Sequence, residues 1–411
     1  MRLLKQWPHM QLASICTKIG SGSTPRGGDG VYVDAGTAII RSQNIYNGKF
    51  SVGGLAHLTE KHAEQLNGVT VESRDVLLNI TGDSVARCCQ VPEWVLPARV
   101  NQHVAIVRPD SSQLLPEFLC YYFVSPLMQK YLLSRAGSGG TRNALTKGMI
   151  ESLEVPCPDL ATQQRVVNLL RNYDDLIENN RRRIQLLEQA ARLLYKEWFV
   201  HLRFPGHEHV KITNGVPDGW ERLKIADVCE TFGGGTPSTK NPDYWDGEIT
   251  WVVPSDVTQN GVLVLLESER KITERGLKKS SAKMLPPDTI LMTSRASVGF
   301  FAVMDVPVCT NQGFINIVPH DPGIRMYVLF NLLSRVEEIR SNAKGTTYPE
   351  ISKSRFRDME ITVPPRSVAG AFEDLTSATI RQIRVLMRTN SKLTKARDLL
   401  LPRLMNGTIP V

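Results

Sequence analysis

Two long stretches of the chain place apolar residues at alternating spacings of four and three, the pattern of a helix that packs on another helix. Pro158 precedes the first stretch and Pro364-Pro365 the second, while Pro402 should kink or stop the second near its end. The first seam is Val166, Leu170, Tyr173, Ile177, Asn180, Ile184, Leu187, Ala191, Leu194 and Trp198. The second, more polar seam is Phe372, Leu375, Thr379, Ile383, Leu386, Asn390, Leu393, Arg397, Leu400 and Leu404.

Each predicted helix is the obvious partner for the other. If they run antiparallel with Val166 near Leu404, Asn180 lies opposite Asn390. An asparagine in an apolar seam destabilises the pair unless it is matched, and such residues often fix the register of two helices. The pattern therefore predicts an antiparallel coil with the two amides in contact. The alternative is that both asparagines lie on a solvated edge and are unrelated.

The rest of the chain contains short β-branched and apolar runs bounded by Gly, Pro, Asn and Asp, which predict strands. The expected strands are Thr37–Ile40, Val76–Ile80, Val104–Val107, Ile249–Val253, Thr289–Met292 and Phe314–Val318. One helical stretch follows each set of strands, over Pro116–Ser134 and over Met326–Ala343. The pattern indicates two mixed α/β globules.

The chain also repeats itself. Thr24-Pro25 recurs as Thr236-Pro237, Asn101-Gln102 as Asn311-Gln312, and Val155-Pro156 as Val363-Pro364, always about 210 residues later. An ordered series with a nearly constant offset indicates an internal duplication. The sequence therefore predicts an α/β fold with a pseudo-two-fold repeat: two similar α/β domains separated by two long antiparallel helices that form a coiled coil. The expected segments are 1–158, 159–210, 211–366 and 367–411.

Composition narrows the class of protein. The chain has 411 residues, 42% of them hydrophobic and 22% charged, with a net charge of +8, as expected for globular domains and compatible with a polyanionic partner. No apolar run has the length of a membrane span, and the first 12 residues do not resemble a signal peptide. Seven cysteines without a CxxC pair indicate reduced thiols in a cytoplasmic protein.

The predicted architecture could hold two binding domains at a fixed distance from each other. About 33 helical residues make a rod of roughly 50 Å, and one turn of B-DNA is about 34 Å. Two related globules on such a rod could contact one face of a duplex about one turn apart. Because the globules differ in sequence, we expect them to read different half-sites around an unread spacer.

Several motifs resemble the specificity subunit of type I restriction-modification systems across essentially the whole chain. They are Gly22-x-Thr24-Pro25, Gly234-x-Thr236-Pro237, Tyr244-Trp245-x-Gly247, Asn311-Gln312-Gly313, the Gly139 and Gly345 loops, Tyr195–Phe199 and the closing Leu399–Gly407. The first globule has Val31-Tyr32-Val33 where the second has Tyr244-Trp245, which is a departure from the pattern. The motifs identify the chain as a member of that family.

The resemblance implies a non-catalytic subunit that reads a bipartite DNA site. It implies partners: double-stranded DNA, two methyltransferase subunits docked on the spacer helices and, in systems that cleave DNA, two restriction subunits. It implies no cofactor in this chain, with S-adenosylmethionine in the methyltransferase subunit and ATP and Mg²⁺ in the restriction subunit. Two other readings stay open: a diverged fused DNA adenine methyltransferase, and a scaffold protein that does not bind DNA.

The chain itself offers little catalytic chemistry. Asn241-Pro242-Asp243-Tyr244 lacks the second proline of an adenine methyltransferase motif, and no cofactor-binding strand precedes it. The glycine-rich segments lack the ending of a phosphate loop. His207-Glu208-His209 has no further ligands nearby, which favours a solvated loop over a metal site. We therefore expect no catalytic and no metal-binding residues.

Candidates for DNA contact are residues whose side chains match base edges or phosphates. In the first globule they are Arg26, Arg41, Ser42, Gln43, Asn44, Arg87, Arg99, Arg142, Asn143 and Lys147. In the second they are Lys240, Tyr244, Trp245, Ser255, Asp256, Arg295, Lys344, Thr346, Thr347, Tyr348, Lys353 and Arg355. For each, an ordinary surface side chain is the alternative. Specificity should lie where the copies differ, which favours Gln43, Asn44 and Asn143 against Asp256, Thr347 and Tyr348.

Two further groups are ambiguous. Asn101-Gln102 and Asn311-Gln312 occur in both copies, which favours a structural turn over base reading. Arg181-Arg182-Arg183 on the first long helix could contact spacer phosphates, although a charge run usually marks a solvated face.

Overall fold

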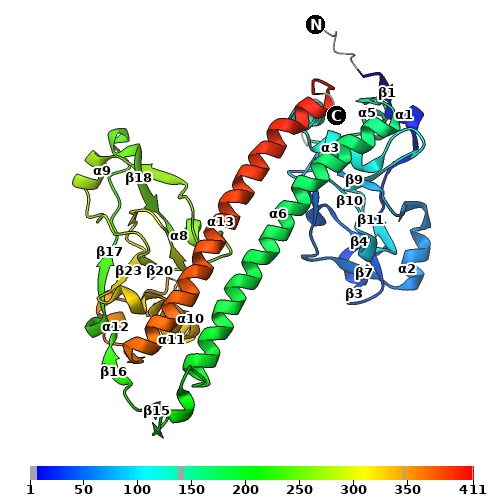
Figure 1. The fold of residues 1–411 in the computed structure, drawn as a ribbon. Helices are drawn as coiled ribbons and strands as arrows, with labels where there is room; N and C mark the ends of the chain where they lie inside the picture. The colour runs from blue at the N-terminus through cyan, green and yellow to red at the C-terminus, as the bar shows by residue number, and fades with distance from the viewer. Residues whose placement is uncertain (1–6, 138–142, 346–347, 410) are drawn as a thin grey trace. The chain divides into compact units, whose positions relative to one another are not determined.

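The computed structural model describes residues 7–137, 143–345, 348–409 and 411. The chain divides into two compact units, residues 1–177 with 392–411 and residues 178–391. Each unit combines one α/β globule with part of each long helix, so the packing units differ from the four sequence segments (Figure 1). We describe each unit by itself.

Unit 1 contains a four-stranded sheet of antiparallel neighbours in the order β10-β9-β12-β2. A second sheet has the order β3-β7-β4-β11-β8, and β1 pairs with β13. The four-stranded sheet comprises β2 (Cys16–Ser21), β9 (Val76–Asn79), β10 (Cys88–Gln90) and β12 (Val104–Pro109). The other strands named here are β1 (His9–Gln11), β3 (Tyr32–Val33), β4 (Thr37–Ile40), β7 (Ala56–Leu58), β8 (Thr70–Val71), β11 (Ala98–Val100) and β13 (Glu154–Pro156).

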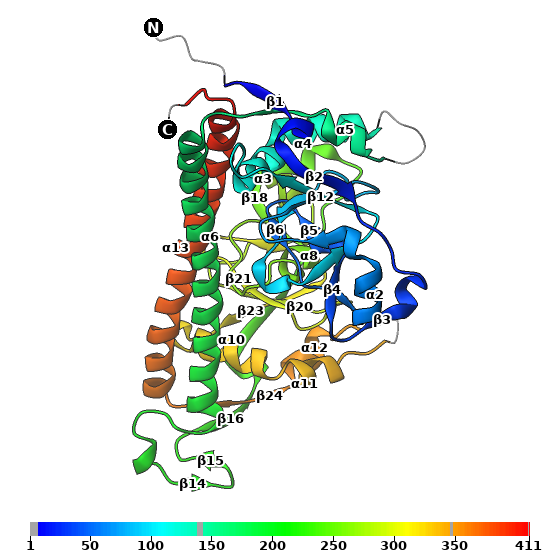
Figure 2. The same cartoon turned by 90° about the vertical axis from the view of Figure 1, so that its right-hand side faces the viewer.

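Unit 2 repeats this topology. Its four-stranded sheet has the order β17-β23-β20-β21, which is the order of the first sheet read from its other edge. A smaller sheet has the order β19-β18-β22, and β16 pairs with β24 (Figure 2) as β1 pairs with β13. The strands are β16 (Glu221–Lys224), β17 (Cys229–Gly233), β18 (Trp245–Val252), β19 (Arg270–Ile272), β20 (Ile290–Thr293), β21 (Phe301–Val303), β22 (Cys309–Thr310), β23 (Phe314–Pro319) and β24 (Glu360–Val363). The predicted internal repeat is confirmed.

All six predicted strands are present, but the two single helices predicted beside the sheets are wrong. The first is divided into α3 (Pro116–Val124) and α4 (Pro126–Gly137), and the second into α10 (Arg325–Ser334) and α11 (Val336–Ser341). Ser125 is extended, with φ −64° and ψ 144°, because a residue before proline avoids the helical region. In the second copy no proline follows, yet Arg335 leaves helical geometry with φ −113° and ψ 23°.

The two long helices are α6 (Leu160–Tyr195) and α13 (Arg366–Met405), and α6 continues into a π-helical turn over Lys196–Val200. All ten residues of the first predicted seam are buried or half-buried. In α13 the prediction fails at Leu375, which is 52% exposed, whereas Thr376 is 1% exposed. The buried face turns here because α13 packs on the sheet core of unit 2 as well as on α6, through Phe372 and Ile380. Pro402 lies inside the last turn, and the helix ends three residues later.

The predicted register of the helix pair is confirmed. In unit 2 the Asn180 side-chain amide donates a hydrogen bond to Asn390 Oδ1 over 2.9 Å. In unit 1 Arg397 forms a 2.6 Å ion pair with Asp174, and the Tyr121 hydroxyl donates to the same carboxylate over 2.7 Å. From Asp174 to Asn180 the residue numbers rise along α6, while those of their partners fall from Arg397 to Asn390 along α13, as expected for an antiparallel pair.

Replacement of Asn180 by leucine should destabilise the protein by about 1 kcal/mol, because Asn390 then loses this donor within a partly buried seam. The double variant Asn180→Leu/Asn390→Leu should recover at least that loss while weakening the unique register, since no polar group remains to be matched. Urea denaturation followed by circular dichroism measures the first effect, and cysteine cross-linking across the pair measures the second.

Asn172→Leu on the exposed face of α6 is the matched control and should change stability by less than about 0.5 kcal/mol. Single variants that unfold at the same urea concentration as the wild-type protein would show that the amide pair does not determine the register.

Candidate nucleic-acid interface

Loops from separate parts of each unit meet beside the four-stranded sheet. The Gly-x-Thr-Pro loop follows β2 in unit 1 and β17 in unit 2. It is held against the residue that precedes the Asn-Gln dipeptide by a backbone bond in each unit, from Ser23 N–H to the Val100 carbonyl at 3.0 Å and from Gly235 N–H to the Thr310 carbonyl at 2.8 Å. The repeated motifs at the two ends of these bonds are therefore neighbours in space.

The close approach explains one glycine in each loop. A β-carbon on Gly22 would overlap the backbone carbonyl oxygens of Val100 and Asn101, and one on Gly234 would overlap those of Thr310 and Asn311. Only glycine lets the loop backbone lie directly on the Asn-Gln segment.

The Asn-Gln dipeptide forms the same turn in both units. Asn101 Oδ1 accepts the His103 N–H over 3.1 Å, and Asn311 Oδ1 accepts the Gly313 N–H over 2.9 Å. Such a bond two residues along the chain is the mark of an Asx turn. The prediction of a structural turn is confirmed for the asparagines. Gln102 and Gln312 are exposed beside it.

In unit 2 the turn forms one wall of a pocket of about 350 Å³. Arg295, Gln312 and Tyr348 line it, and Tyr348 is 69% exposed. Thr236 of the Gly-x-Thr-Pro loop donates its hydroxyl to Gln312 Oε1. The structure thus brings together two predicted residues, Arg295 and Tyr348, that are 53 positions apart in the sequence.

The other exposed candidates of unit 2 lie on segments next to these walls. Ser255 follows Pro254, which lines the pocket, and Lys344 pairs through its backbone with Glu350. Lys353 and Arg355 lie on α12 (Lys353–Arg357), where Arg355 Nε donates to Asn342 Oδ1 over 2.8 Å. Lys240 is exposed after the Gly-x-Thr-Pro loop.

Fewer of the residues predicted to contact DNA are exposed in unit 1 than in unit 2. Arg26, Gln43, Asn143 and Lys147 are exposed, and the Lys147 ammonium lies 3.5 Å from Glu151. Ser42 and Arg87 are half-buried, and the Arg87 guanidinium lies over the Tyr46 ring at 5.0 Å.

Asn44 and Asp256 were expected to read bases, and the structure gives them another role. Asn44 is fully buried, and its amide accepts from Arg41 N–H at 3.0 Å and donates to the Ser51 carbonyl at 2.9 Å. Asp256 accepts the N–H groups of Val253 and Glu269, at 2.8 and 3.1 Å. Both side chains close the turn that follows β4 or β18. The prediction is wrong for Asn44, because a fully buried amide with these bonds cannot reach DNA.

Two more residues predicted to contact DNA support the loops from inside. Arg99 is 8% exposed, and it donates to the Ala63 carbonyl and to Asn67 Oδ1 at 3.1 and 2.9 Å. Burial lowers the pKa of its guanidinium, so these bonds hold a charge that lacks full hydration. Trp245 is 7% exposed and donates its indole N–H to the Ser238 carbonyl over 3.2 Å. The prediction that Arg99 and Trp245 contact DNA is wrong, because both are buried.

Arg41 and Tyr244 are intermediate cases. The Arg41 guanidinium donates to the Gly54 carbonyl and lies 5.3 Å from the Tyr32 ring centre, so it braces its own loop. Tyr244 is half-buried and packs on the cluster around Trp245. Arg142, Thr346, Thr347 and the Gly139 of the loop motif lie outside the described residues.

The sequence did not identify two residues at the interface of unit 1. His103 Nδ1 lies 2.6 Å from the Thr81 hydroxyl, and its Nε2 lies 3.1 Å from the Gln102 amide nitrogen. The signal that could have found His103 is its position directly after the repeated Asn-Gln. Thr81 had no such signal, because only the fold brings it next to the turn.

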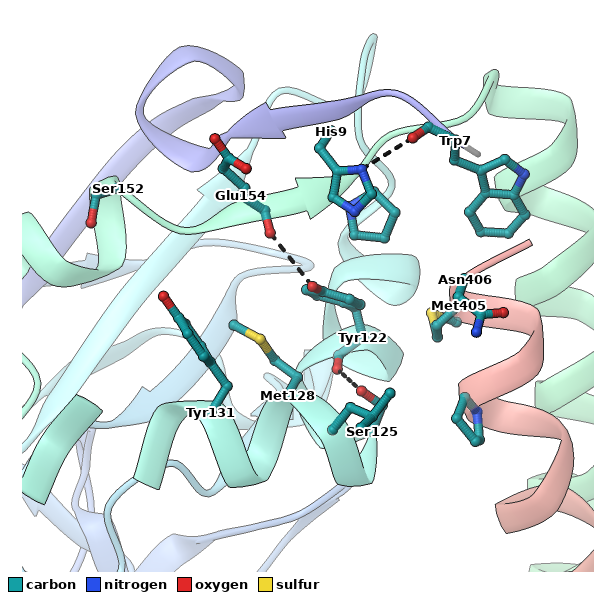
Figure 3. A pocket seen from close by; sticks show the side chains of 13 residues that line it. Trp7, His9, Tyr122, Ser125, Met128, Tyr131, Ser152, Glu154, Met405 and Asn406 are labelled. Carbon is teal, nitrogen blue, oxygen red and sulfur yellow. Dashed lines mark hydrogen bonds between the residues drawn. The ribbon is translucent and has the colours of Figure 1, made fainter. Parts of the chain in front are cut away.

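Unit 1 also has a larger hollow of about 630 Å³ beside the end of α13 (Figure 3). Its walls include the aromatic rings of Trp7, Tyr122 and Tyr131. The corresponding hollow of unit 2 measures about 350 Å³, and its wall contains Tyr195 and Phe199. In the larger hollow of unit 1, Pro402 and Met405 of α13 take the place of these two aromatic residues. No lysine or arginine is among the described residues that line the larger hollow, so it does not suit a phosphate backbone.

Within the described ranges, no group of three or more His, Cys, Asp and Glu side chains is arranged to hold a metal ion. The seven cysteines are free, and burial raises the pKa of Cys309 to about 11, so this thiol stays protonated at neutral pH. None of the described helices has the length and apolar character needed to cross a membrane.

Comparisons with known proteins agree on one family. The model of the type I restriction modification DNA specificity domain matches residues 5–189 and 217–371. The type I restriction enzyme MjaIX specificity subunit of Methanocaldococcus jannaschii is 35% identical over 189 residues, 44% of each chain. The HindI specificity subunit of Haemophilus influenzae is 24% identical over 373 residues, 75% of this chain and 81% of that one. A crystal structure of a type I S subunit from M. genitalium has a TM-score of 0.62 at 15% identity and covers 98% of both chains, which shows a shared fold.

Substitution of Gly234 by alanine should displace the Gly-x-Thr-Pro loop of unit 2 and destabilise the protein by about 1–3 kcal/mol, because the added methyl group overlaps backbone carbonyl oxygens. The neighbouring Gly233 has open space at its β-carbon position, so Gly233→Ala is a matched control that should be close to neutral. Urea denaturation of both variants measures the difference. Equal stability of the two variants would contradict the close approach of loop and turn.

Proposed function

Because the chain belongs to the family of type I restriction modification DNA specificity domains, we propose that it is the sequence-specific DNA-recognition subunit of a type I restriction-modification complex. Each unit reads one half of a bipartite, asymmetric site. The observation that carries this proposal is that both units present the same supporting loops, built on Gly-x-Thr-Pro and Asn-Gln, while the exposed side chains around those loops differ.

The chemistry of the exposed residues supports a duplex as the ligand. Arg295, Lys353 and Lys147 are exposed at the loops, and the chain carries a net charge of +8. Arginine and lysine neutralise phosphates, and arginine, asparagine and glutamine also bind base edges in the major groove. The shared turns position the backbone of the DNA, and the differing side chains select the bases.

The long helices supply the spacing between half-sites. The 36 residues of α6 extend about 54 Å at 1.5 Å per residue. α6 and α13 each contribute to both units without interruption, and the amide pair of Asn180 and Asn390 fixes their register. In the proposed complex, helices shared by both units would make the number of unread base pairs part of the recognised site.

The same helices provide docking surfaces for two methyltransferase subunits, and for restriction subunits in systems that cleave DNA. Leu186, Leu193 and Leu399 are exposed apolar residues on these helices, at 54, 54 and 71%. This chain holds no cofactor in the proposed assembly. S-adenosylmethionine belongs to the methyltransferase subunit, and ATP with Mg²⁺ to the restriction subunit.

Sequence selection from random duplexes should return two fixed half-sites separated by a constant spacer. Insertion of two base pairs into that spacer rotates one half-site by about 70° relative to the other, given 10–10.5 base pairs per turn. We expect binding to fall to the non-specific level, because the uninterrupted helices cannot follow that rotation. Substitution of spacer bases without a change of length is the control and should leave binding intact.

Titration of the isolated chain with S-adenosylmethionine by calorimetry tests the proposal against a fused methyltransferase. We expect no heat of binding up to millimolar concentrations, whereas a methyltransferase would bind with a typical micromolar constant. A chain that binds partner proteins but retains no specific duplex would instead be the scaffold of the second alternative.

A further inference from the structure

Backbone hydrogen bonds next to the Asn-Gln turn show which residues of the two units occupy equivalent positions. After β9 the Ile80 N–H donates to the His103 carbonyl over 3.0 Å. After β20 the Ser294 N–H donates to the Gly313 carbonyl over 2.8 Å. His103 and Gly313 each stand two residues after the asparagine of the turn, so they occupy the same position.

A second pair of bonds fixes the residues that follow. The Gly82 N–H donates to the Asn143 carbonyl over 3.2 Å, and the Ala296 N–H donates to the Pro349 carbonyl over 2.9 Å. The residue between the two bonds is Thr81 in unit 1 and Arg295 in unit 2. These two side chains therefore project from the same place on the two scaffolds.

The side chains at these equivalent positions differ in size and charge. In unit 1 the His103 imidazole occupies the space over the turn, held by the Thr81 hydroxyl at 2.6 Å. In unit 2 glycine replaces the histidine and arginine replaces the threonine. The result is the open pocket of about 350 Å³ with the Arg295 side chain in its wall.

The guanidinium of Arg295 is available for a ligand. The residue is exposed, and its one ion pair with the part of the chain that the structure describes is a 3.7 Å approach of Nε to Glu350 Oε2, near the limit of such a contact. Arg295 is the single cationic residue among the described residues that line the pocket. Tyr348, 69% exposed, stands at the rim and offers a ring for contact with a base or sugar.

An arginine fork matches the two acceptors that guanine presents in the major groove, its O6 and N7 atoms. Threonine and histidine present single donors and cannot make that bidentate pair. The same scaffold position therefore favours guanine in unit 2 and a different preference in unit 1.

We propose that Arg295 reads a guanine in the half-site bound by unit 2, and that the exchange of Thr81 and His103 for Arg295 and Gly313 is one source of the difference between the two half-sites. This inference rests on the proposed function and names the base class at one position of its site. Arg295 acts as a specificity-determining residue, while the asparagine turn below it only positions the loops.

The test is sequence selection by the full chain from a duplex library randomised in both half-sites, with wild-type protein and the variants Arg295→Ala and Arg295→Lys. We expect the preference for guanine at one base pair of one half-site to fall roughly 5- to 150-fold with Arg295→Ala and by a smaller factor with Arg295→Lys. Lysine keeps the charge and can donate to guanine O6 or N7, but it lacks the fork, so it should retain only part of the preference. The other half-site is the internal control and should be selected as before.

Two further variants separate base reading from other roles. Lys353→Ala removes an exposed cation whose counterpart, Lys147, is present in the other unit, and it should weaken binding to all sequences equally. Glu350→Gln removes the acid beside Arg295 and should keep the guanine preference, which would be lost if the ion pair only shaped the loop.

Uniform weakening by Arg295→Ala, with unchanged base preference, would overturn this inference alone and identify Arg295 as a phosphate contact. A wild-type chain that selects no split site would overturn the proposed function and the inference together.

Discussion

Neither globule of this protein has a complete core without both long helices. In unit 1 Val166 and Leu170 of α6 and Leu404 of α13 belong to the core cluster that holds the four-stranded sheet. In unit 2 Ile184 of α6 and Phe372 of α13 have the same place in the other core. Apolar burial is the main favourable contribution to folding, so the helices and the sheets depend on each other for stability. A change in the register of the helix pair would disturb both cores.

Polar contacts select one register out of those that apolar burial alone would permit. A shift of the helices by one turn would separate Asn180 from Asn390 and Asp174 from Arg397. In unit 2 Arg325 also joins Asp288 and Glu373, at 3.1 and 2.8 Å, which ties α13 to the globule. Such groups add little net stability, but a mismatch is costly because it leaves partly buried polar groups without these partners.

At the candidate interface, the residues that hold the loops in place are different from those whose side chains could distinguish two ligands. Asn101 and Asn311 close the same turn, and Gly22 and Gly234 allow the same loop to lie on it. Features common to both units cannot distinguish two different half-sites. The residues that can do so are those with different side chains on equivalent backbone, such as Thr81 and Arg295. Under the proposed function, this division would let one fold carry two specificities without a change in its hydrogen-bonded framework.

Local periodicity was enough to predict a large part of the fold. Both long helices and the contact of Asn180 with Asn390 follow from the spacing of apolar residues and one antiparallel alignment. The six strands follow from short apolar runs bounded by turn residues, and the internal repeat follows from dipeptides that recur about 210 residues later. The predicted seam of α13 is wrong at Leu375, because this helix also packs on the sheet core of unit 2.

Tertiary structure decided which polar residues are free to meet a ligand. The residue types of Asn44 and Arg99 suit DNA, yet Asn44 is enclosed by the segment around Ser51 and Arg99 is bound to the Ala63 carbonyl. His103 and Thr81 meet only because two strands pair in a given register. The sequence by itself determined the elements, the duplication and the types of residue available. The exposure of each side chain was decided by packing between segments far apart in the chain, which no local pattern encodes.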